Sequence, residues 1–337
     1  MKNIILLLLW LGASYSTIGQ SISISLPLDR AVYQRNSSDQ ASITIAGQCL
    51  TTTDPTYGYM IRYKVEQLNK SGSVISTITN WTDIISRPFA GIYRTSSTFS
   101  KGWYLLSVGQ FNYTSPSTVS SSAATVSTAK FGVGEVIFTA GQSNIQGIPI
   151  SSGANNMPPS VTAYDCVSAF NSNCYCKAVK YPASFMNIPS VSSYGDDGNY
   201  KIAPNGTRSP WYYQAWGKWI AEKETNGLPV VFFNSGFSGS FVKSWWESVT
   251  DSTVSSTARQ GGLIVCDGNT DGGSDGTTGQ PYIGFKSTLK FYGGLYGARG
   301  VVWHQGEADN EDNTSAANYQ TRLQAVIAIV CKGLAKK

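Results

Sequence analysis

Between residue 21 and about residue 130, hydrophobic positions form short alternating runs separated by turn residues. Apolar and polar residues alternate in these runs, a pattern typical of half-buried strands, and clusters of Asn, Asp, Gly, Ser and Pro lie between them. The segment holds no convincing helical period. Six short strands at this spacing predict an antiparallel β-sandwich, Ig-like in outline. The predicted strands are residues 22–26, 41–45, 59–65, 74–78, 91–94 and 103–109.

After residue 130 the pattern changes to strands that alternate with helices. Apolar runs predict strands at residues 135–140, 230–234 and 300–305, and longer periodic segments predict helices at residues 209–224, 282–296 and 315–334. The first helix opens with Ser209-Pro210, an N-cap followed by proline at the first helical position. This alternation predicts an α/β unit with a mostly parallel sheet and helices on both faces. In such sheets ligands bind beyond the carboxyl ends of the strands.

We therefore divide the chain into a signal peptide at residues 1–19, a β-sandwich at 20–130 and an α/β unit at 131–337. Residues 114–128 consist almost wholly of Ser, Thr, Ala and Val and are predicted as an edge strand, a linker or both. Lys2 precedes a short apolar run that ends in small residues, which is the layout of a secretory signal peptide. The alternative, a buried N-terminal strand or helix, fits these flanks less well.

The predicted protein is secreted, periplasmic or attached to the cell surface, without a membrane span. The N-terminal apolar run is too short to cross a bilayer, and no later segment approaches the ~20 apolar residues required. Charged residues make up 13% of the chain, against about 25% in an average soluble domain. The net charge is +5, but the basic residues are scattered, so we expect no nucleic-acid partner.

The cysteines are compatible with an oxidising compartment, and a set of six allows fifteen full pairings. Cys166 with Cys174 or Cys176 is the favoured local bridge because the intervening segment is short and loop-like. A zinc site is the rival interpretation, but one Cys-x-Cys and a single histidine disfavour it. We predict neither a metal nor a cofactor. The six are Cys49, Cys166, Cys174, Cys176, Cys266 and Cys331.

Three motifs follow the three predicted strands of the α/β unit. Gly141-Gln142-Ser143-Asn144 places a serine on a tight strand-to-helix turn, where backbone N–H groups can stabilise an oxyanion. The ordinary alternative for such a serine is a helix N-cap. The second motif, residues 236–245, contains glycines that let the backbone approach a ligand, although a simple turn would also need them. The third motif, residues 303–310, reads Trp-His-Gln-Gly-Glu-Ala-Asp-Asn.

In this order and at these strand ends, the motifs resemble the SGNH/GDSL hydrolases, and most closely the sialate O-acetylesterase-like carbohydrate esterases. The resemblance covers about residues 131–325. It implies an SGNH (flavodoxin-like) parallel sheet with flanking helices, in a cofactor-free serine esterase that removes O-acetyl groups from carbohydrates. It makes Ser143 the nucleophile, and Gly239 and Gln305 donors to the oxyanion. Second-shell residues or a possible substrate wall are then expected at Asn144, His304, Glu307 and Trp245.

The sequence departs from the family at the general base. The family takes this base and its orienting carboxylate from an Asp-x-x-His near the C-terminus, whereas His304 is the single histidine here and no such motif follows it. Alternate side chains of a strand face opposite ways, so His304 should point away from Gln305 unless the strand has already ended. We therefore expect His304 to be a packing or second-shell residue rather than the base.

Two hypotheses follow from the missing motif. The first is an O-acetylesterase whose printed sequence is incomplete at the C-terminus. The second is a non-catalytic glycan-binding or surface protein built on a degenerate SGNH domain. The three motifs favour the enzyme, whereas the absence of Asp-x-x-His favours the binding protein, because without a base a serine hydroxyl is a poor nucleophile.

Overall fold

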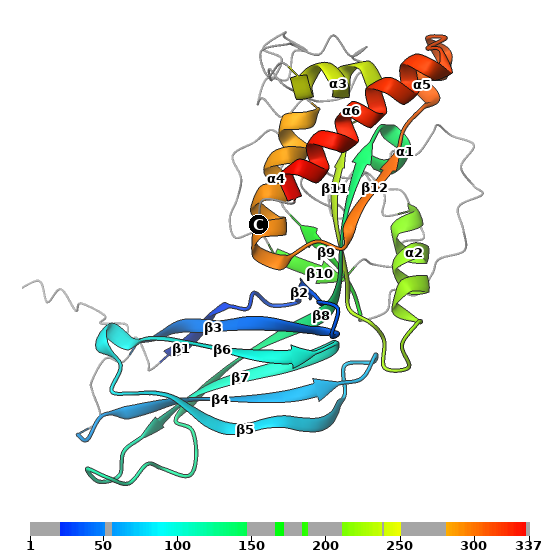
Figure 1. The fold of residues 1–337 in the computed structure, drawn as a ribbon. Helices are drawn as coiled ribbons and strands as arrows, with labels where there is room; N and C mark the ends of the chain where they lie inside the picture. The colour runs from blue at the N-terminus through cyan, green and yellow to red at the C-terminus, as the bar shows by residue number, and fades with distance from the viewer. Residues whose placement is uncertain are drawn as a thin grey trace, which may run out of the picture.

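The computed structural model describes residues 21–50, 56–146, 166–171, 184–187, 211–237, 239–250 and 281–334. It shows a mixed α/β fold in which strands predominate, with a nine-stranded mixed sheet and a three-stranded antiparallel sheet (Figure 1). The predicted signal peptide and the Ser209-Pro210 helix start lie outside the described residues.

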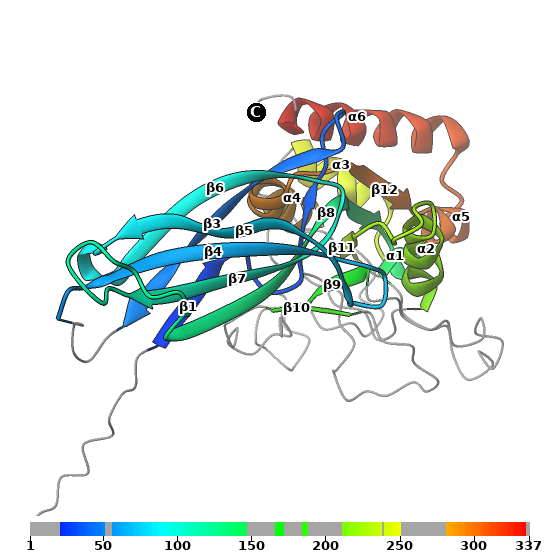
Figure 2. The same ribbon diagram turned by 90° about the horizontal axis from the view of Figure 1, so that it is seen from below.

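The strands are β1 (Ser21–Leu26), β2 (Ala31–Gln34), β3 (Gln40–Leu50), β4 (Tyr59–Leu68), β5 (Val74–Ser86), β6 (Ile92–Ser100), β7 (Gly102–Asn112), β8 (Thr125–Gly141), β9 (Val167–Asn171), β10 (Ser184–Asn187), β11 (Val230–Gly236) and β12 (Gly300–His304). The α-helices are α1 (Ser143–Gln146), α2 (Trp211–Ala221), α3 (Val242–Thr250), α4 (Tyr282–Tyr296), α5 (Glu307–Glu311) and α6 (Ala316–Leu334). The labelled helices lie at one end of the sandwich (Figures 1 and 2).

The first half of the chain forms a sandwich of two sheets. One layer has the strand order β1-β3-β6, and the other contains β4, β5, β7 and the first half of β8. Alternating residues of β3 are buried, among them Ile43 and Ile45, and they meet Val65 and Leu106 from the opposite layer in one core. The alternation of hydrophobic and polar residues in these strands therefore reflects the burial of one face of each strand between the two sheets. The six predicted strands are confirmed as β1 and β3–β7, most of them longer than predicted.

Strand β8 runs from the sandwich into the α/β half without interruption. Residues 125–133 pair antiparallel with β7, and residues 137–141 pair parallel with β12. Residues 131–134 pair with β2 and residues 135–141 with β11. The directions of the peptide groups place β7 and β11 on one edge of β8, and β2 and β12 on the other. The strand predicted at residues 135–140 thus begins ten residues earlier, and residues 125–128 are strand rather than linker. Residue 130 lies inside this strand, and the division of the chain there stays a prediction.

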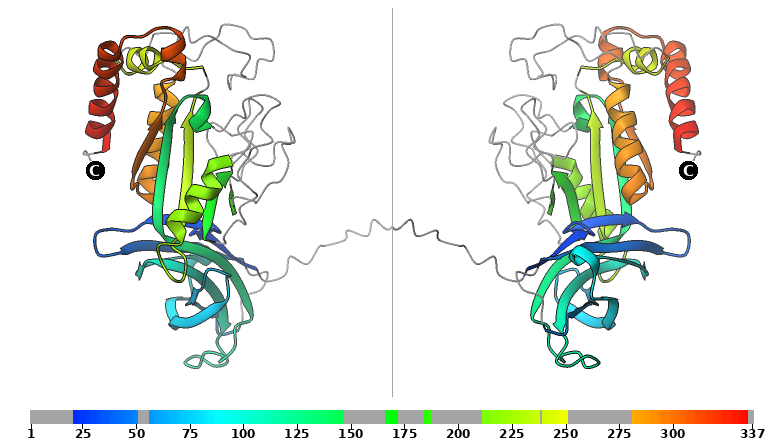
Figure 3. Two further views of the ribbon diagram at one scale, coloured as in Figure 1. Left: turned by 90° about the vertical axis from the view of Figure 1, so that its right-hand side faces the viewer. Right: turned by 90° about the vertical axis from the view of Figure 1, so that its left-hand side faces the viewer.

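The second half of β8 is the centre of a mostly parallel sheet with the order β10-β9-β11-β8-β12. Helices cover both faces of this sheet (Figure 3). Two neighbouring phenylalanines of β11 contact one helix on each face. Phe232 packs against Tyr213 of α2, with ring centroids 5.2 Å apart, whereas Phe233 stacks on Tyr292 of α4 at 4.9 Å. Because successive side chains of a strand point to opposite faces, α2 and α4 lie on opposite sides of the sheet.

The other predicted elements of this half are found with small shifts. The helix predicted at 209–224 is α2, that at 282–296 is α4 with the same bounds, and that at 315–334 is α6. The strands predicted at 230–234 and 300–305 are β11 and β12. Strands β2, β9 and β10 and helices α3 and α5 were not predicted. They are short, from four to nine residues, and short elements carry little periodicity.

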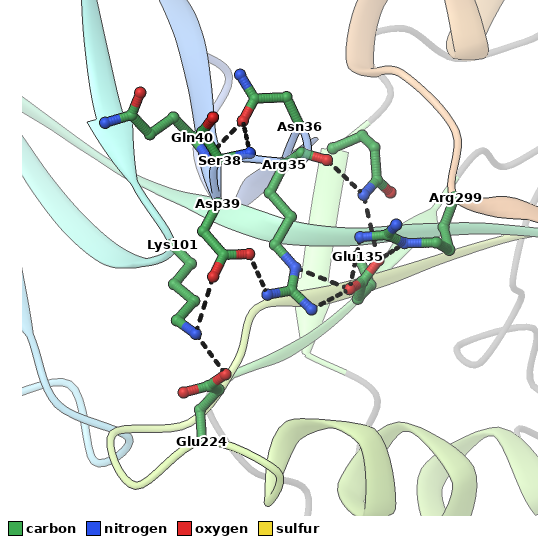
Figure 4. A network of polar contacts seen from close by, with 10 residues as sticks. Arg35, Asn36, Ser38, Asp39, Gln40, Lys101, Glu135, Glu224 and Arg299 are labelled. Atoms are coloured by element: carbon green, nitrogen blue, oxygen red, sulfur yellow. Dashed lines mark hydrogen bonds and ion pairs between the residues drawn. The ribbon is translucent and has the colours of Figure 1, made fainter.

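The carboxylate of Glu135 lies where β8 exchanges its neighbours (Figure 4). Its side chain is 7% exposed and accepts hydrogen bonds from Arg35 Nε at 2.9 Å, Arg299 Nε at 2.5 Å and Gln34 Nε2 at 3.2 Å. Gln34 ends β2, Arg35 follows it, and Arg299 precedes β12. The buried carboxylate of Glu135 thus connects β8 to the end of β2 and to the start of β12.

Burial raises the pKa of Glu135, but the hydrogen bonds from Arg299 and the other donors outweigh it, so the pKa lies below the usual value of a glutamate. The network continues at the surface, where Arg35 also binds Asp39 and Lys101 joins Asp39 to Glu224 (Figure 4). Glu224 lies between α2 and β11, so the network extends from the sandwich to the α/β half.

No helix in the described part of the chain is both long and apolar enough to cross a membrane. Cys49 is buried and Cys331 exposed, both as free thiols. The bridge predicted for Cys166 is not tested, because Cys174 and Cys176 lie outside the described residues.

We predict that Glu135→Gln lowers the free energy of unfolding by about 2 kcal/mol, because two guanidinium groups lose their buried partner. Because the pKa of Glu135 is lowered by folding, its contribution is present above the usual glutamate pKa of about 4.3 and is lost as the pH falls through the lower folded value. Urea unfolding between pH 7 and pH 3 measures both effects. The loss of unfolding free energy between pH 7 and pH 3 should be smaller in Glu135→Gln than in the parent.

The matched control is Asp83→Asn, which removes the carboxylate of an exposed pair with Arg62. Exposed pairs contribute about 0–1 kcal/mol, so this variant should unfold close to the parent. Equal losses of unfolding free energy in Glu135→Gln and Asp83→Asn would contradict the role assigned to Glu135.

Candidate active site

The three sequence motifs meet at one edge of the parallel sheet. In β8, Gly141 is paired with Gly236 of β11 on one side and with His304 of β12 on the other. The carboxyl ends of the three strands are therefore level, and each motif begins or continues in the turn that follows its strand (Figures 1 and 3). The predicted site residues Ser143, Gly239 and Gln305 lie in these three turns.

Gly141 makes the tight turn before Ser143 possible. Its φ of 137° is rarely adopted by other residues, and a Cβ atom here would lie 1.9 Å from the carbonyl oxygen of His304. The next residue, Gln142, donates its backbone N–H to that same oxygen at 3.0 Å. The turn that carries Ser143 is thus hydrogen-bonded directly to the end of β12.

Ser143 is the first residue of α1 and is partly exposed. No side chain in the described ranges hydrogen-bonds its hydroxyl. Gly239 lies in the turn between β11 and α3 with a φ of 70°, which favours glycine. Ser143 and Gly239 thus lie in the turns at the strand ends where the resemblance places them. Their catalytic roles stay predictions.

A buried polar cluster joins the three motifs. Gln142 is 4% exposed, and its side-chain oxygen accepts hydrogen bonds from Gln305 Nε2 at 3.1 Å and from the backbone N–H groups of Gly306 and Ala308. Gln305 Nε2 also donates to the carbonyl oxygen of Ser240, at 3.1 Å. Gln142, Ser240 and Gln305 come from the first, second and third motif, so this cluster fixes the motifs relative to one another.

The same contacts bear on the oxyanion role predicted for Gln305. Its Nε2 group carries two hydrogens, and three protein acceptors surround it: Gln142 Oε1, Ser240 O and Asp309 Oδ2. Donation to an oxyanion would require Gln305 to give up one of these bonds. The position of Gln305 beside the site agrees with the prediction, and its role as an oxyanion donor stays a prediction.

Asp309 is a structural member of the site that the sequence analysis did not single out. It is 2% exposed, and its Oδ2 atom accepts the backbone N–H of Val242, the first residue of α3, at 2.8 Å. A carboxylate at a helix N-terminus is favourable both as a cap and toward the helix dipole. Asp309 belongs to the third motif, but only the contact with α3 reveals what it does.

The interpretation of Trp245 as a substrate wall was wrong. Its side chain is fully buried, and its ring lies 5.0 Å from that of Trp303. Its Nε1–H group donates to Ser240 Oγ at 2.9 Å. The amphipathic helix α3 turns this residue toward the core, so Trp245 supports the second motif from behind.

Tyr319 anchors α6 to the third motif. Its hydroxyl donates to the carbonyl oxygen of Gln305 at 2.8 Å and accepts from Trp303 Nε1 at 3.3 Å. Burial raises the pKa of Tyr319, so the hydroxyl stays protonated and able to donate. Helix α6 thereby fixes the backbone of the residue that bonds all three motifs.

His304 and Asn144 meet at one oxygen of Glu307. His304 Nε2 lies 3.1 Å from Glu307 Oε1, and Asn144 Nδ2 donates to the same atom. The His304 side chain is 52% exposed. His304 is therefore not a packed core residue, and the supporting role expected for it beside the site stays a prediction.

The described ranges hold no group of three or more His, Cys, Asp or Glu side chains placed to bind an ion. The Asp309 carboxylate accepts hydrogen bonds from Val242 and Gln305. The Glu307 carboxylate accepts one from Asn144 and lies within ion-pair distance of His304.

No protein-family model matches the chain, and no curated protein matches its sequence. Among solved structures it is similar to a carbohydrate acetylesterase from Xanthomonas citri, with 15% identity and a TM-score of 0.42 over 94% of this chain and 58% of that chain. It thus spans little more than half the length of that enzyme. A CARDB domain from Pyrococcus furiosus matches 34% of this chain and 90% of that one, with 11% identity and a TM-score of 0.20. These TM-scores are low, so the functional proposal rests on the site residues.

We predict that Gly141→Ala disrupts the site, because its Cβ atom would collide with the His304 carbonyl group in a backbone conformation that alanine rarely adopts. The expected result is a loss of about 2 kcal/mol or more of unfolding free energy, measured with urea. Gly300→Ala on β12 is the matched control, because nothing lies within 4 Å of its added Cβ. The prediction fails if both variants are as stable as the parent.

Proposed function

We propose that this protein is a serine esterase that removes O-acetyl groups from carbohydrates, with sialate O-acetylesterase-like chemistry. One observation carries the proposal: three motifs from distant parts of the chain meet at the ends of three parallel strands beside the partly exposed Ser143. Gln142, Ser240 and Gln305 hydrogen-bond them together. A simple helix cap at Ser143 would not require this convergence.

In the proposed reaction Ser143 Oγ attacks the acetyl carbonyl carbon and loses its proton to a base. The backbone N–H groups of Ser143 and Gly239 stabilise the resulting oxyanion. The bond between the acetyl carbon and the sugar oxygen then breaks, and the sugar leaves with a proton. Water attacks the acetyl-serine in the same way, which releases acetate and restores the hydroxyl group.

We predict that Ser143→Ala lowers the rate of acetate release by about 10³-fold or more. Released acetate is measured with O-acetylated sialic acid and with an O-acetylated neutral sugar, which separates the sialate specificity from the general activity. Ser287→Ala, on the exposed side of α4, should retain the parent rate. Full activity of Ser143→Ala would exclude the proposed nucleophile.

The glycan-binding alternative predicts a different result from the same proteins. Saturable binding of an acetylated sugar without acetate release, and equal affinity of the parent and Ser143→Ala, would replace the esterase with a binding function.

A further inference from the structure

We propose that His304, oriented by Glu307, is the general base that activates Ser143; this inference rests on the proposed function. The site then contains its own base and orienting carboxylate within the third motif.

The position of His304 supports this role. Its backbone is paired with Gly141, and its carbonyl oxygen accepts the N–H group of Gln142, the residue before Ser143. Strand β12 ends at His304, and Gly306 then turns the chain with a φ of 148°. The imidazole therefore extends from the strand end that is bonded to the nucleophile turn.

Glu307 connects the imidazole to the residue after Ser143. Its Oε1 atom lies 3.1 Å from His304 Nε2, within ion-pair distance, and accepts a hydrogen bond from Asn144 Nδ2. Backbone bonding through Gln142 and the Glu307 contact with Asn144 thus connect His304 to the residues on both sides of Ser143. A surface histidine without a role would not need two such connections.

The contact with Glu307 also bears on which ring nitrogen is available. A carboxylate oxygen 3.1 Å from Nε2 favours a hydrogen on that nitrogen, so the neutral ring carries its lone pair on Nδ1. Within the described ranges the ring forms no other ion pair or hydrogen bond, and the side chain is 52% exposed. Nδ1 is therefore accessible to accept a proton.

In the proposed step Nδ1 takes the proton of Ser143 as Oγ bonds to the acetyl carbon. The imidazolium that forms lies against the Glu307 carboxylate, which stabilises its charge. The same proton passes to the sugar oxygen when the ester bond breaks. Nδ1 then accepts a proton from water in the second half of the reaction and returns it to Ser143 Oγ, so the enzyme is restored.

A fluorophosphonate probe tests the base independently of the sugar, because it reacts with an activated serine. Intact-mass measurement gives the labelling rate, and peptide mapping gives the labelled residue. We expect label at Ser143 in the parent, none at this position in Ser143→Ala, and a rate lowered about 10²–10⁴-fold in His304→Ala. Added imidazole should restore part of the rate in His304→Ala.

Glu307→Gln tests the positioning residue. Its labelling rate should fall between those of the parent and His304→Ala, and imidazole should not restore it, because the histidine is still present. The control is Glu311→Gln, an exposed carboxylate at the end of the same helix, which should label as the parent does. A Glu307→Gln rate equal to the parent would overturn the positioning role.

The outcomes separate the two proposals. If the parent is not labelled at Ser143, both the proposed esterase function and the proposed general base are wrong. If the parent is labelled at Ser143 and His304→Ala is labelled as fast, only the base is wrong. A slow His304→Ala variant that imidazole does not accelerate, with an unfolding midpoint below that of the parent, would make His304 structural rather than catalytic.

Discussion

Glu135 lies where strand β8 leaves one set of neighbours and joins another, and its carboxylate binds Arg35 and Arg299 from the two flanking segments. A buried charge is costly unless it is paired, and removing either side of such a pair leaves the other uncompensated. The arrangement of β2 and β12 beside β8 depends on this contact. The turn that carries Ser143 begins six residues further along the same strand, so the position of Ser143 depends on the same crossing.

A second set of contacts, hydrogen bonds among buried amide and carboxylate groups, holds the site together. The amides of Gln142 and Gln305 and the carboxylate of Asp309 bond to one another and to backbone groups of all three turns. Such buried networks specify one geometry because each lost partner leaves a polar group unsatisfied. Gln305 thus helps to fix the three turns, and its role as an oxyanion donor stays a prediction.

Much of the fold could be predicted because each half has a clear period. Alternation revealed β1 and β3–β7, and the helix at residues 282–296 was predicted with the bounds of α4. The full length of β8 could not be seen, because its first half alternates as a half-buried strand while its second half is buried on both faces. The burial of Trp245 could not be predicted for a related reason. Where a helix or strand begins or ends sets the direction of a side chain, and these ends are determined by tertiary contacts such as Asp309 with Val242.

The continuous strand β8 also has a consequence for how this molecule can change during evolution. A sandwich joined to a catalytic half by a loop can be exchanged by recombination, because the exchanged piece needs only a compatible linker. Here a donor segment would have to supply a strand that pairs antiparallel with β7, changes partners at a buried glutamate and ends in the nucleophile turn. Shuffling at this junction is therefore disfavoured, and the two halves are expected to be inherited as one unit.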